Sequence, residues 1–179
     1  MLVLVTGGSG SGKSAFAEQR LLEFGDAARF YIATMRCRDE ESFARVERHR
    51  RMRSGKGFVT VECPLRLKDL VLPRKDANVL LECLSNLAAN EMFDPDGSGD
   101  AALKSVEDGI DSLRKQCDNL LVVTNEIFSD GGRYDPQMEA YLRLLGRLNC
   151  DLAAMADEVV EVTGSIPLMV KRCGAENDD

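Results

Sequence analysis

The sequence predicts an α/β domain with a mostly parallel sheet that helices cover on both faces. Three observations support this fold class. Short apolar runs recur along the 179 residues, and most are continuous, which is typical of strands buried on both faces of a parallel sheet. Helical patterns separate these runs, as in right-handed β–α–β crossovers. The first run also leads through a glycine-rich loop directly into a helical pattern.

The predicted strands and helices alternate along the chain. Strands are expected at residues 2–6, 29–34, 58–62, 79–83, 120–124, 158–163 and 168–171. Helices are expected at residues 14–24, 39–53, 65–72, 84–93, 101–117 and 136–156. The last two strands are joined by "GSIP", which is too short for a crossover and predicts a C-terminal hairpin. No linker divides the chain, so we expect one domain at residues 1–173 and a disordered tail at 174–179.

Charge, cysteine pattern and hydropathy narrow the class of protein. The formal net charge of −7 disfavours nucleic-acid binding, which needs a basic footprint. The six cysteines include no C-x-x-C pair, so we expect reduced thiols in a cytoplasmic protein rather than a zinc site or a disulfide framework. No run of about 18 apolar residues occurs, and we therefore expect no membrane span.

The segment "GGSGSGKS" at residues 7–14 matches the phosphate-binding pattern G-x-x-x-x-G-K-[ST], in its expected place between a strand and a helix. Glycines let the backbone wrap around a phosphate, and N–H groups at the start of the helix point toward the anion. Lys13 would bridge the outer phosphates, and the Ser14 hydroxyl would join the shell of a Mg²⁺ ion. The predicted nucleotide-binding residues of this loop are Gly7, Gly8, Ser9, Gly10, Ser11, Gly12, Lys13 and Ser14.

Acidic residues follow several predicted strands, at the sheet edge where ligands of open parallel sheets gather. The candidates are Glu62, Glu82, and Asn125 with Glu126. We prefer Glu82 as the metal-side carboxylate, together with Ser14, because it ends an apolar strand as a Walker B acid does. Each acid alone is equally well explained as a polar residue that terminates a strand.

A dense basic segment contains the only histidine of the chain. Residues 45–56 carry six lysines and arginines against one glutamate, and His49 lies among them. Nearby cations disfavour the imidazolium, so the ring would stay neutral and nucleophilic while the guanidinium groups bind phosphate. A solvated basic helix explains the same residues, and at this point both interpretations stay open.

Several blocks of the sequence resemble one enzyme family in order and spacing. They are "LVTGGSGSGKSAFAE", "YIATM", "ARVERHRRMR" followed by "TVE", "VLLECLSNLAANEMF", "VVTNEI" and "GRLNCDLAAMADEVVEVTGSIPLMVK". With these blocks the chain resembles the bifunctional adenosylcobinamide kinases / adenosylcobinamide-phosphate guanylyltransferases, from its first strand to about Lys171. The resemblance implies a RecA-like P-loop NTPase fold and a homotrimer.

The resemblance also implies two reactions on a corrinoid substrate, with Mg²⁺ as cofactor and GTP and ATP as substrates. Family members phosphorylate adenosylcobinamide, then transfer GMP from GTP onto that phosphate through a GMP–histidine intermediate and release pyrophosphate. His49 matches the family histidine, and Lys13 is the second expected catalytic residue. Outside the loop, the positions that match the family's nucleotide contacts are Ala33, Thr34, Met35, Arg50, Arg51, Met52, Arg53, Glu62 and Glu82.

The sequence also departs from the family pattern. Gly10 stands where many relatives have an arginine, and Arg48 stands where many have a second histidine. The segment after "TNE" differs as well, which leaves its expected corrinoid contacts open. Two rival functions would also use a phosphate-binding loop: a kinase of another small hydroxyl compound, without a covalent intermediate, and a non-catalytic GTP-binding module, against which the lack of a partner-type repeat or tail counts.

Overall fold

The computed structural model describes residues 1–36, 40, 44, 46–47, 51, 53–129, 132 and 134–173. Seven strands form one sheet in the order β3-β2-β4-β5-β1-β6-β7. All neighbouring pairs are parallel except β6 and β7, which form an antiparallel hairpin. The strands are β1 (Leu2–Thr6), β2 (Ala28–Ala33), β3 (Phe58–Glu62), β4 (Ala77–Glu82), β5 (Asn119–Val123), β6 (Glu158–Thr163) and β7 (Ile166–Arg172).

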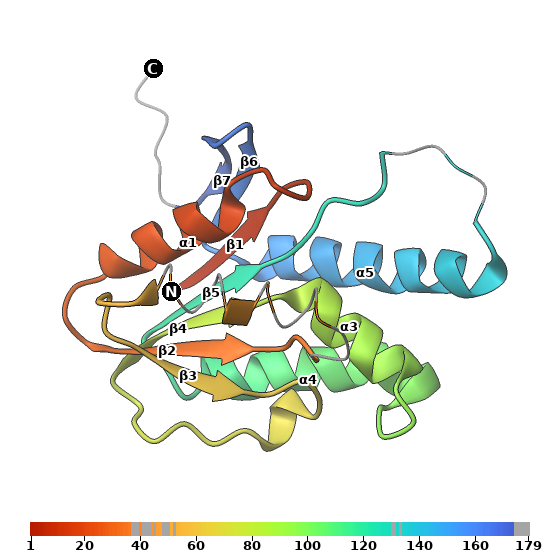
Figure 1. Ribbon diagram of the computed structural model, residues 1–179, viewed down its shortest axis with the longest axis horizontal. Helices are drawn as coiled ribbons and strands as arrows, with labels where there is room; N and C mark the ends of the chain where they lie inside the picture. Colours follow the sequence, from red (N-terminus) through yellow and green to blue (C-terminus); the bar gives the residue numbers. More distant parts are fainter. Residues whose placement is uncertain are drawn as a thin grey trace.

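Helices lie on both faces of the sheet (Figure 1). Helix α1 covers one face, and α3, α4 and α5 cover the other (Figure 1). Their bounds are α1 (Lys13–Leu22), α3 (Leu84–Phe93), α4 (Ala102–Arg114) and α5 (Pro136–Met155), with short 3-10 turns η1 (Leu67–Asp69) and η2 (Gly99–Ala101). This arrangement confirms the predicted fold class. Among the described residues, no helix is long and apolar enough to cross a membrane.

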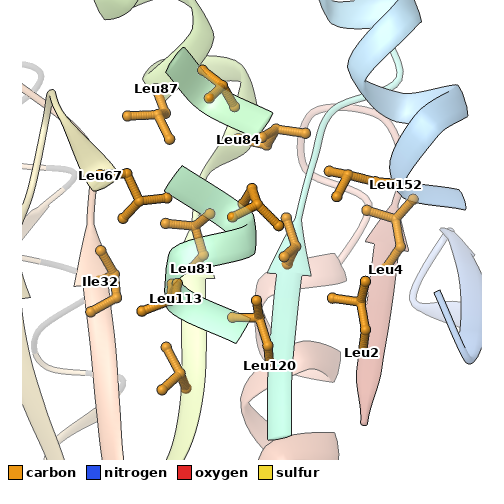
Figure 2. Packing of buried hydrophobic residues seen from close by; sticks show 14 of the residues in the cluster. Leu2, Leu4, Ile32, Leu67, Leu81, Leu84, Leu87, Leu113, Leu120 and Leu152 are labelled. Carbon is orange, nitrogen blue, oxygen red and sulfur yellow. The ribbon is translucent and has the colours of Figure 1, made fainter. Parts of the chain in front are cut away.

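The strands contribute side chains to two separate hydrophobic layers, because successive side chains along a strand point to opposite faces of the sheet. Leu2 and Leu4 pack with α3, α4 and α5, whereas Val3 and Val5 pack with α1. Figure 2 shows the larger layer, in which leucines of β1, β4 and β5 and Ile32 of β2 pack against leucines of α3, α4 and α5. Burying each such side chain stabilises the fold by about 1.5–3 kcal/mol, so this alternation holds the carboxyl ends of the strands in place.

The helix predicted at residues 65–72 is wrong, because only the 3-10 turn η1 forms there. Arg66 has a left-handed φ of 53°, which does not continue a helix. The Gln116 side chain, just beyond α4, accepts from the Leu72 N–H and donates to the Leu70 carbonyl. Side-chain bonds thus satisfy backbone groups that a helix would have paired.

The predicted C-terminal hairpin is confirmed, with a tight turn at Gly164 and Ser165, both of which have positive φ. In the helix predicted at 39–53, the described residues Glu40, Ala44, Val46, Glu47, Arg51 and Arg53 are helical. The other positions of that stretch, His49 included, lie outside the described residues, as does the predicted tail at 174–179. The division into one domain and a tail stays a prediction.

Candidate active site

The glycine-rich loop links β1 to α1 as predicted. The Ser11 N–H donates to the Gly8 carbonyl at 3.2 Å and closes the loop. Gly12 caps α1 with a left-handed φ of 92°, a conformation that favours glycine. Lys13 then begins the helix, and its Nζ donates to the Gly8 carbonyl at 3.0 Å. The lysine charge and the helix N-terminus are therefore held at the same loop.

Lys13 is only 9% exposed. Burial lowers the pKa of its ammonium group, and the nearby acidic groups Cys83 and Glu82 oppose this shift. A cation that is poorly solvated by water gains more from an anionic ligand than an exposed one does. The position therefore suits Lys13 to binding phosphate oxygens.

The loop also rests on the β6–β7 hairpin, where Figure 1 shows the two side by side. The Ser165 N–H donates to the Ser11 carbonyl at 2.8 Å. A Cβ at Gly12 would lie 2.7 Å from the Ser165 hydroxyl, and a Cβ at Gly7 would lie 2.4 Å from the Val162 carbonyl oxygen. These two glycines are thus needed for close packing on the hairpin, a constraint that the motif alone did not indicate.

Glu82 and Ser14 are brought together by the sheet and α1. The Ser14 hydroxyl donates to Oε1 of Glu82 at 2.7 Å. The register places Ala33 opposite both Glu62 and Glu82, so the two acids end the strands on either side of β2 at the same level. A serine hydroxyl beside a carboxylate is an oxygen donor pair of the kind that Mg²⁺ takes together with substrate phosphates, so these residues fit the expected ion.

Thr34 is fully buried, and its hydroxyl is used within the protein. Its Oγ1 accepts from the Cys83 N–H at 2.7 Å and donates to the Cys83 carbonyl at 2.9 Å. The Asn90 side chain donates to the carbonyls of Thr34 and Pro64, at 2.8 and 2.9 Å. Thr34 therefore joins the ends of β2 and β4, while its neighbours Ala33 and Met35 are partly exposed.

At the described end of the basic segment, residues 51 and 53–56, some basic side chains are exposed to solvent and others are buried. Arg51 is exposed. Arg53 is only 6% exposed, and its Cζ lies 3.4 Å from the centroid of the Tyr31 ring. Lys56 donates to the buried Glu18 of α1 at 2.6 Å. An open hollow of about 530 Å³ adjoins this end, lined by Arg53, Ser54, Gly55, Gly57, Phe58 and Thr60.

His49, Arg50 and Met52 lie outside the described residues, so their expected roles stay predictions. The other acidic candidates lie at the predicted sheet edge. Glu62 is exposed at the end of β3. Glu126 accepts from the Phe128 N–H and the Ser129 hydroxyl, and thus caps its own loop.

Asn125 was a sequence candidate, but sequence reasoning missed Ser85 and Tyr141, which brace the same ends of the strands from the α3–α5 face. Asn125 donates to the Ser85 hydroxyl at 2.5 Å, and the Tyr141 hydroxyl donates to the Ser85 carbonyl at 3.0 Å. The Ser85 hydroxyl also lies 2.7 Å from the buried thiol of Cys83. The only signal in the sequence was the polar residue directly after each apolar strand.

Comparisons with known proteins identify the family of the chain. Residues 3–170 match the family model described as cobinamide kinase / cobinamide phosphate guanyltransferase. The chain belongs to this family. Two curated relatives are both described as a bifunctional adenosylcobalamin biosynthesis protein. The protein from Escherichia coli (strain K12) is 35% identical, and the one from Salmonella typhimurium (strain LT2) is 34% identical. Each alignment covers 96% of this chain and 100% of the relative.

Solved structures also resemble this member of the cobinamide kinase / cobinamide phosphate guanyltransferase family. An ATPase domain superposes with a TM-score of 0.50 at 13% identity, over 89% of this chain and 68% of that chain. The likeness concerns the fold alone. The bifunctional kinase and guanylyltransferase assignment itself rests on the family model and the curated relatives.

Proposed function

We propose that this cobinamide kinase / cobinamide phosphate guanyltransferase phosphorylates adenosylcobinamide with a nucleoside triphosphate, then transfers GMP from GTP onto the new phosphate and releases pyrophosphate. The observation that carries the proposal is the phosphate-binding loop with the Ser14–Glu82 contact at 2.7 Å, in a chain that matches the family model over residues 3–170. The product of the second step is adenosylcobinamide-GDP.

In the kinase step, the residues of the loop bind and orient the triphosphate. The backbone N–H groups at the start of α1 donate hydrogen bonds to the phosphate oxygens, and Lys13 neutralises charge on the outer phosphates. Ser14 and Glu82 would hold the Mg²⁺ ion, which supplies charge neutralisation on the phosphates when bound. ATP and GTP both suit these contacts, because the contacts address the phosphates and not the base.

In the second step, His49 is the proposed nucleophile. A ring nitrogen attacks the α-phosphorus of GTP, an N–P bond forms, and the bond to the β-phosphate bridging oxygen breaks to release pyrophosphate. An oxygen of adenosylcobinamide phosphate then attacks the same phosphorus, and the electron pair of the N–P bond returns to the imidazole. The guanidinium groups of Arg50, Arg51 and Arg53 are proposed to neutralise the α-phosphate.

The structure of Arg53 supports its part in this proposal. Its Nη1 is buried and has no hydrogen-bond partner among the described residues. Leaving such a donor unpaired costs about 1–3 kcal/mol, which an acceptor oxygen of a bound nucleotide would remove. Ala33, Met35 and Glu62 lie at the same sheet edge and are proposed as further nucleotide contacts, whereas Thr34 would contribute through its backbone.

The remaining proposals concern the assembly and the cell. We place the protein in the cytoplasm on the cysteine pattern, and five of its cysteines are free thiols in the described part: Cys63, Cys83, Cys117, Cys150 and Cys173. The resemblance to the family supports a homotrimer. The proposed partners are nucleotides and the corrinoid.

The deciding experiment is intact-mass spectrometry of the protein after incubation with GTP and Mg²⁺. The wild type should gain one GMP unit, and the adduct should be lost in acid and survive base, as a phosphoramidate does. His49→Asn keeps a polar side chain of similar size and should gain nothing. A wild type that turns over without an adduct would instead support a kinase that uses no covalent intermediate.

A further inference from the structure

Tyr31 lies at the centre of the α1-facing layer, next to the candidate active site. It is 4% exposed and packs edge-to-face on Phe58, with ring centroids 6.4 Å apart. Its neighbour Ala33 on the same face of β2 is opposite Glu82 of β4. The Tyr31 side chain therefore reaches toward the carboxylate that ends β4.

The hydroxyl end of Tyr31 lies near the carboxylate of Glu82. Burial, the negative charge of Glu82 and a hydrogen bond to that carboxylate raise the pKa of Tyr31 far above its usual value, although Arg53 lowers it somewhat. A tyrosine hydroxyl is protonated near neutral pH in any case, so toward a carboxylate it acts as a donor. Since Glu82 also accepts from Ser14, the tyrosine lies one contact away from the phosphate-binding loop.

The ring of Tyr31 has a second partner in Arg53. The guanidinium carbon lies 3.4 Å from the ring centroid, and the arginine is 6% exposed. Cation–π contacts are strongest when both groups are desolvated in this way. Arg53 lies four residues after His49 in the sequence. A contact that fixes Arg53 therefore also fixes the end of the basic segment at residues 45–56.

We propose that Tyr31 is a positioning residue for GMP transfer, because its ring on β2 seats the guanidinium of Arg53 beside β4, the strand that ends at Glu82. The tyrosine thereby keeps the arginine side of the site and the phosphate-loop side at a constant separation. This inference rests on the proposed function.

Phe30 provides a matched control for the experiment. It precedes Tyr31 in β2, has the same 4% exposure, and points into the opposite hydrophobic layer. Replacing either aromatic ring by leucine removes similar apolar volume from the same strand. Only the change at residue 31 removes a contact with Arg53 and Glu82.

The test compares wild type, Tyr31→Leu, Tyr31→Phe and Phe30→Leu in the release of pyrophosphate from GTP with adenosylcobinamide phosphate as acceptor. Thermal melting confirms that each variant is folded at the assay temperature, and binding of a fluorescent GTP analogue is measured separately. We expect kcat of Tyr31→Leu to fall at least tenfold relative to Phe30→Leu, with GTP affinity changed less than threefold. Tyr31→Phe should recover most of the loss, since it keeps the ring under Arg53.

Equal kcat values for Tyr31→Leu and Phe30→Leu would overturn the proposal, and so would a Tyr31→Phe variant as slow as Tyr31→Leu. Failure of the proposed function looks different, because a wild type that releases no pyrophosphate would remove GMP transfer and with it a role for Tyr31 in that reaction. A wild type that releases pyrophosphate without a histidine adduct would remove only the covalent intermediate, and the comparison of the variants would still decide the role of Tyr31.

Discussion

At the scale of single residues, the site combines a nearly buried cation with a fully buried hydroxyl. The Lys13 ammonium group donates to the Gly8 carbonyl, which is a neutral acceptor. A bound phosphate would take the place of this carbonyl as a charged and therefore stronger acceptor. The Thr34 hydroxyl instead hydrogen-bonds to both the N–H and the carbonyl of Cys83. The two residues should therefore respond to mutation in different ways.

Replacing Lys13 by alanine should strongly weaken triphosphate binding. Loss of a poorly solvated, charge-assisted contact is expected to weaken GTP binding by roughly a hundredfold, with little change in stability. Isothermal titration calorimetry measures this directly. Lys104→Ala on the exposed face of α4 is the matched control and should bind GTP as the wild type does. Unchanged GTP affinity in Lys13→Ala would refute the loop as the nucleotide site.

Thr34→Val should destabilise the fold while leaving nucleotide affinity nearly unchanged. Valine has the same shape but leaves the N–H and carbonyl of Cys83 without their partner in a buried place, at a cost of roughly 2 kcal/mol or more. Urea unfolding measures the change, and Thr163→Val at an exposed position of β6 should cost much less. A Thr34→Val protein of wild-type stability and weakened GTP binding would show that the hydroxyl acts on the ligand.

At the scale of elements, the phosphate-binding loop depends on the hairpin at the other end of the chain. The bond from Ser165 to Ser11 and the absence of room for a Cβ at Gly12 join the first loop to the last turn. The loop geometry is therefore set by packing as well as by glycine freedom. Gly10 has a left-handed φ of 70° too, but a Cβ there would meet nothing within 4 Å.

The pair Gly12→Ala and Gly10→Ala separates the two effects. Alanine at Gly10 should cost only the strain of its backbone conformation, about 1 kcal/mol. Alanine at Gly12 adds a clash with Ser165, so we expect a larger loss of stability and weaker GTP binding. Urea unfolding and calorimetry of both variants check this. Equal effects in the two variants would mean that the hairpin does not constrain the loop.

At the scale of the whole molecule, the last strand leaves an apolar edge. β7 ends the sheet, and its Ile166, Leu168, Met169 and Val170 are all exposed. Monomeric proteins usually protect such an edge with charges, proline or a covering segment. On β7 the proline is Pro167, and the four apolar side chains around it are still exposed. This exposure is consistent with the proposed homotrimer.

Light scattering coupled to size exclusion should therefore find three times the chain mass of 19.7 kDa under assay conditions. Diluting the protein while following specific activity tests whether the assembly matters for catalysis. A fully active monomer would contradict the trimer. An inactive monomer that regains activity on concentration would support a site that needs neighbouring subunits.

The sequence by itself determined the layers of the fold and the location of the phosphate loop. Both are local signals: continuous apolar strands must be buried on two faces, and a glycine-rich turn before a helix presents N–H groups to an anion. Glu82 could also be predicted as the metal-side carboxylate, because it is an acid at the end of an apolar strand and the sequence shows this directly. The roles of His49, Arg50 and Met52 came from resemblance and stay predictions.

Only the tertiary structure decided which polar side chains serve the fold and which remain available to a ligand. Thr34 and Glu82 look alike in sequence, as polar residues at strand ends, yet the first is bonded to Cys83 and the second to Ser14. The stacking of Arg53 on Tyr31 and the failure of the helix at 65–72 likewise depend on partners distant along the chain. Hydrogen bonds and ring contacts between separate segments leave no periodic trace in the sequence, because each requires two positions that only folding brings together.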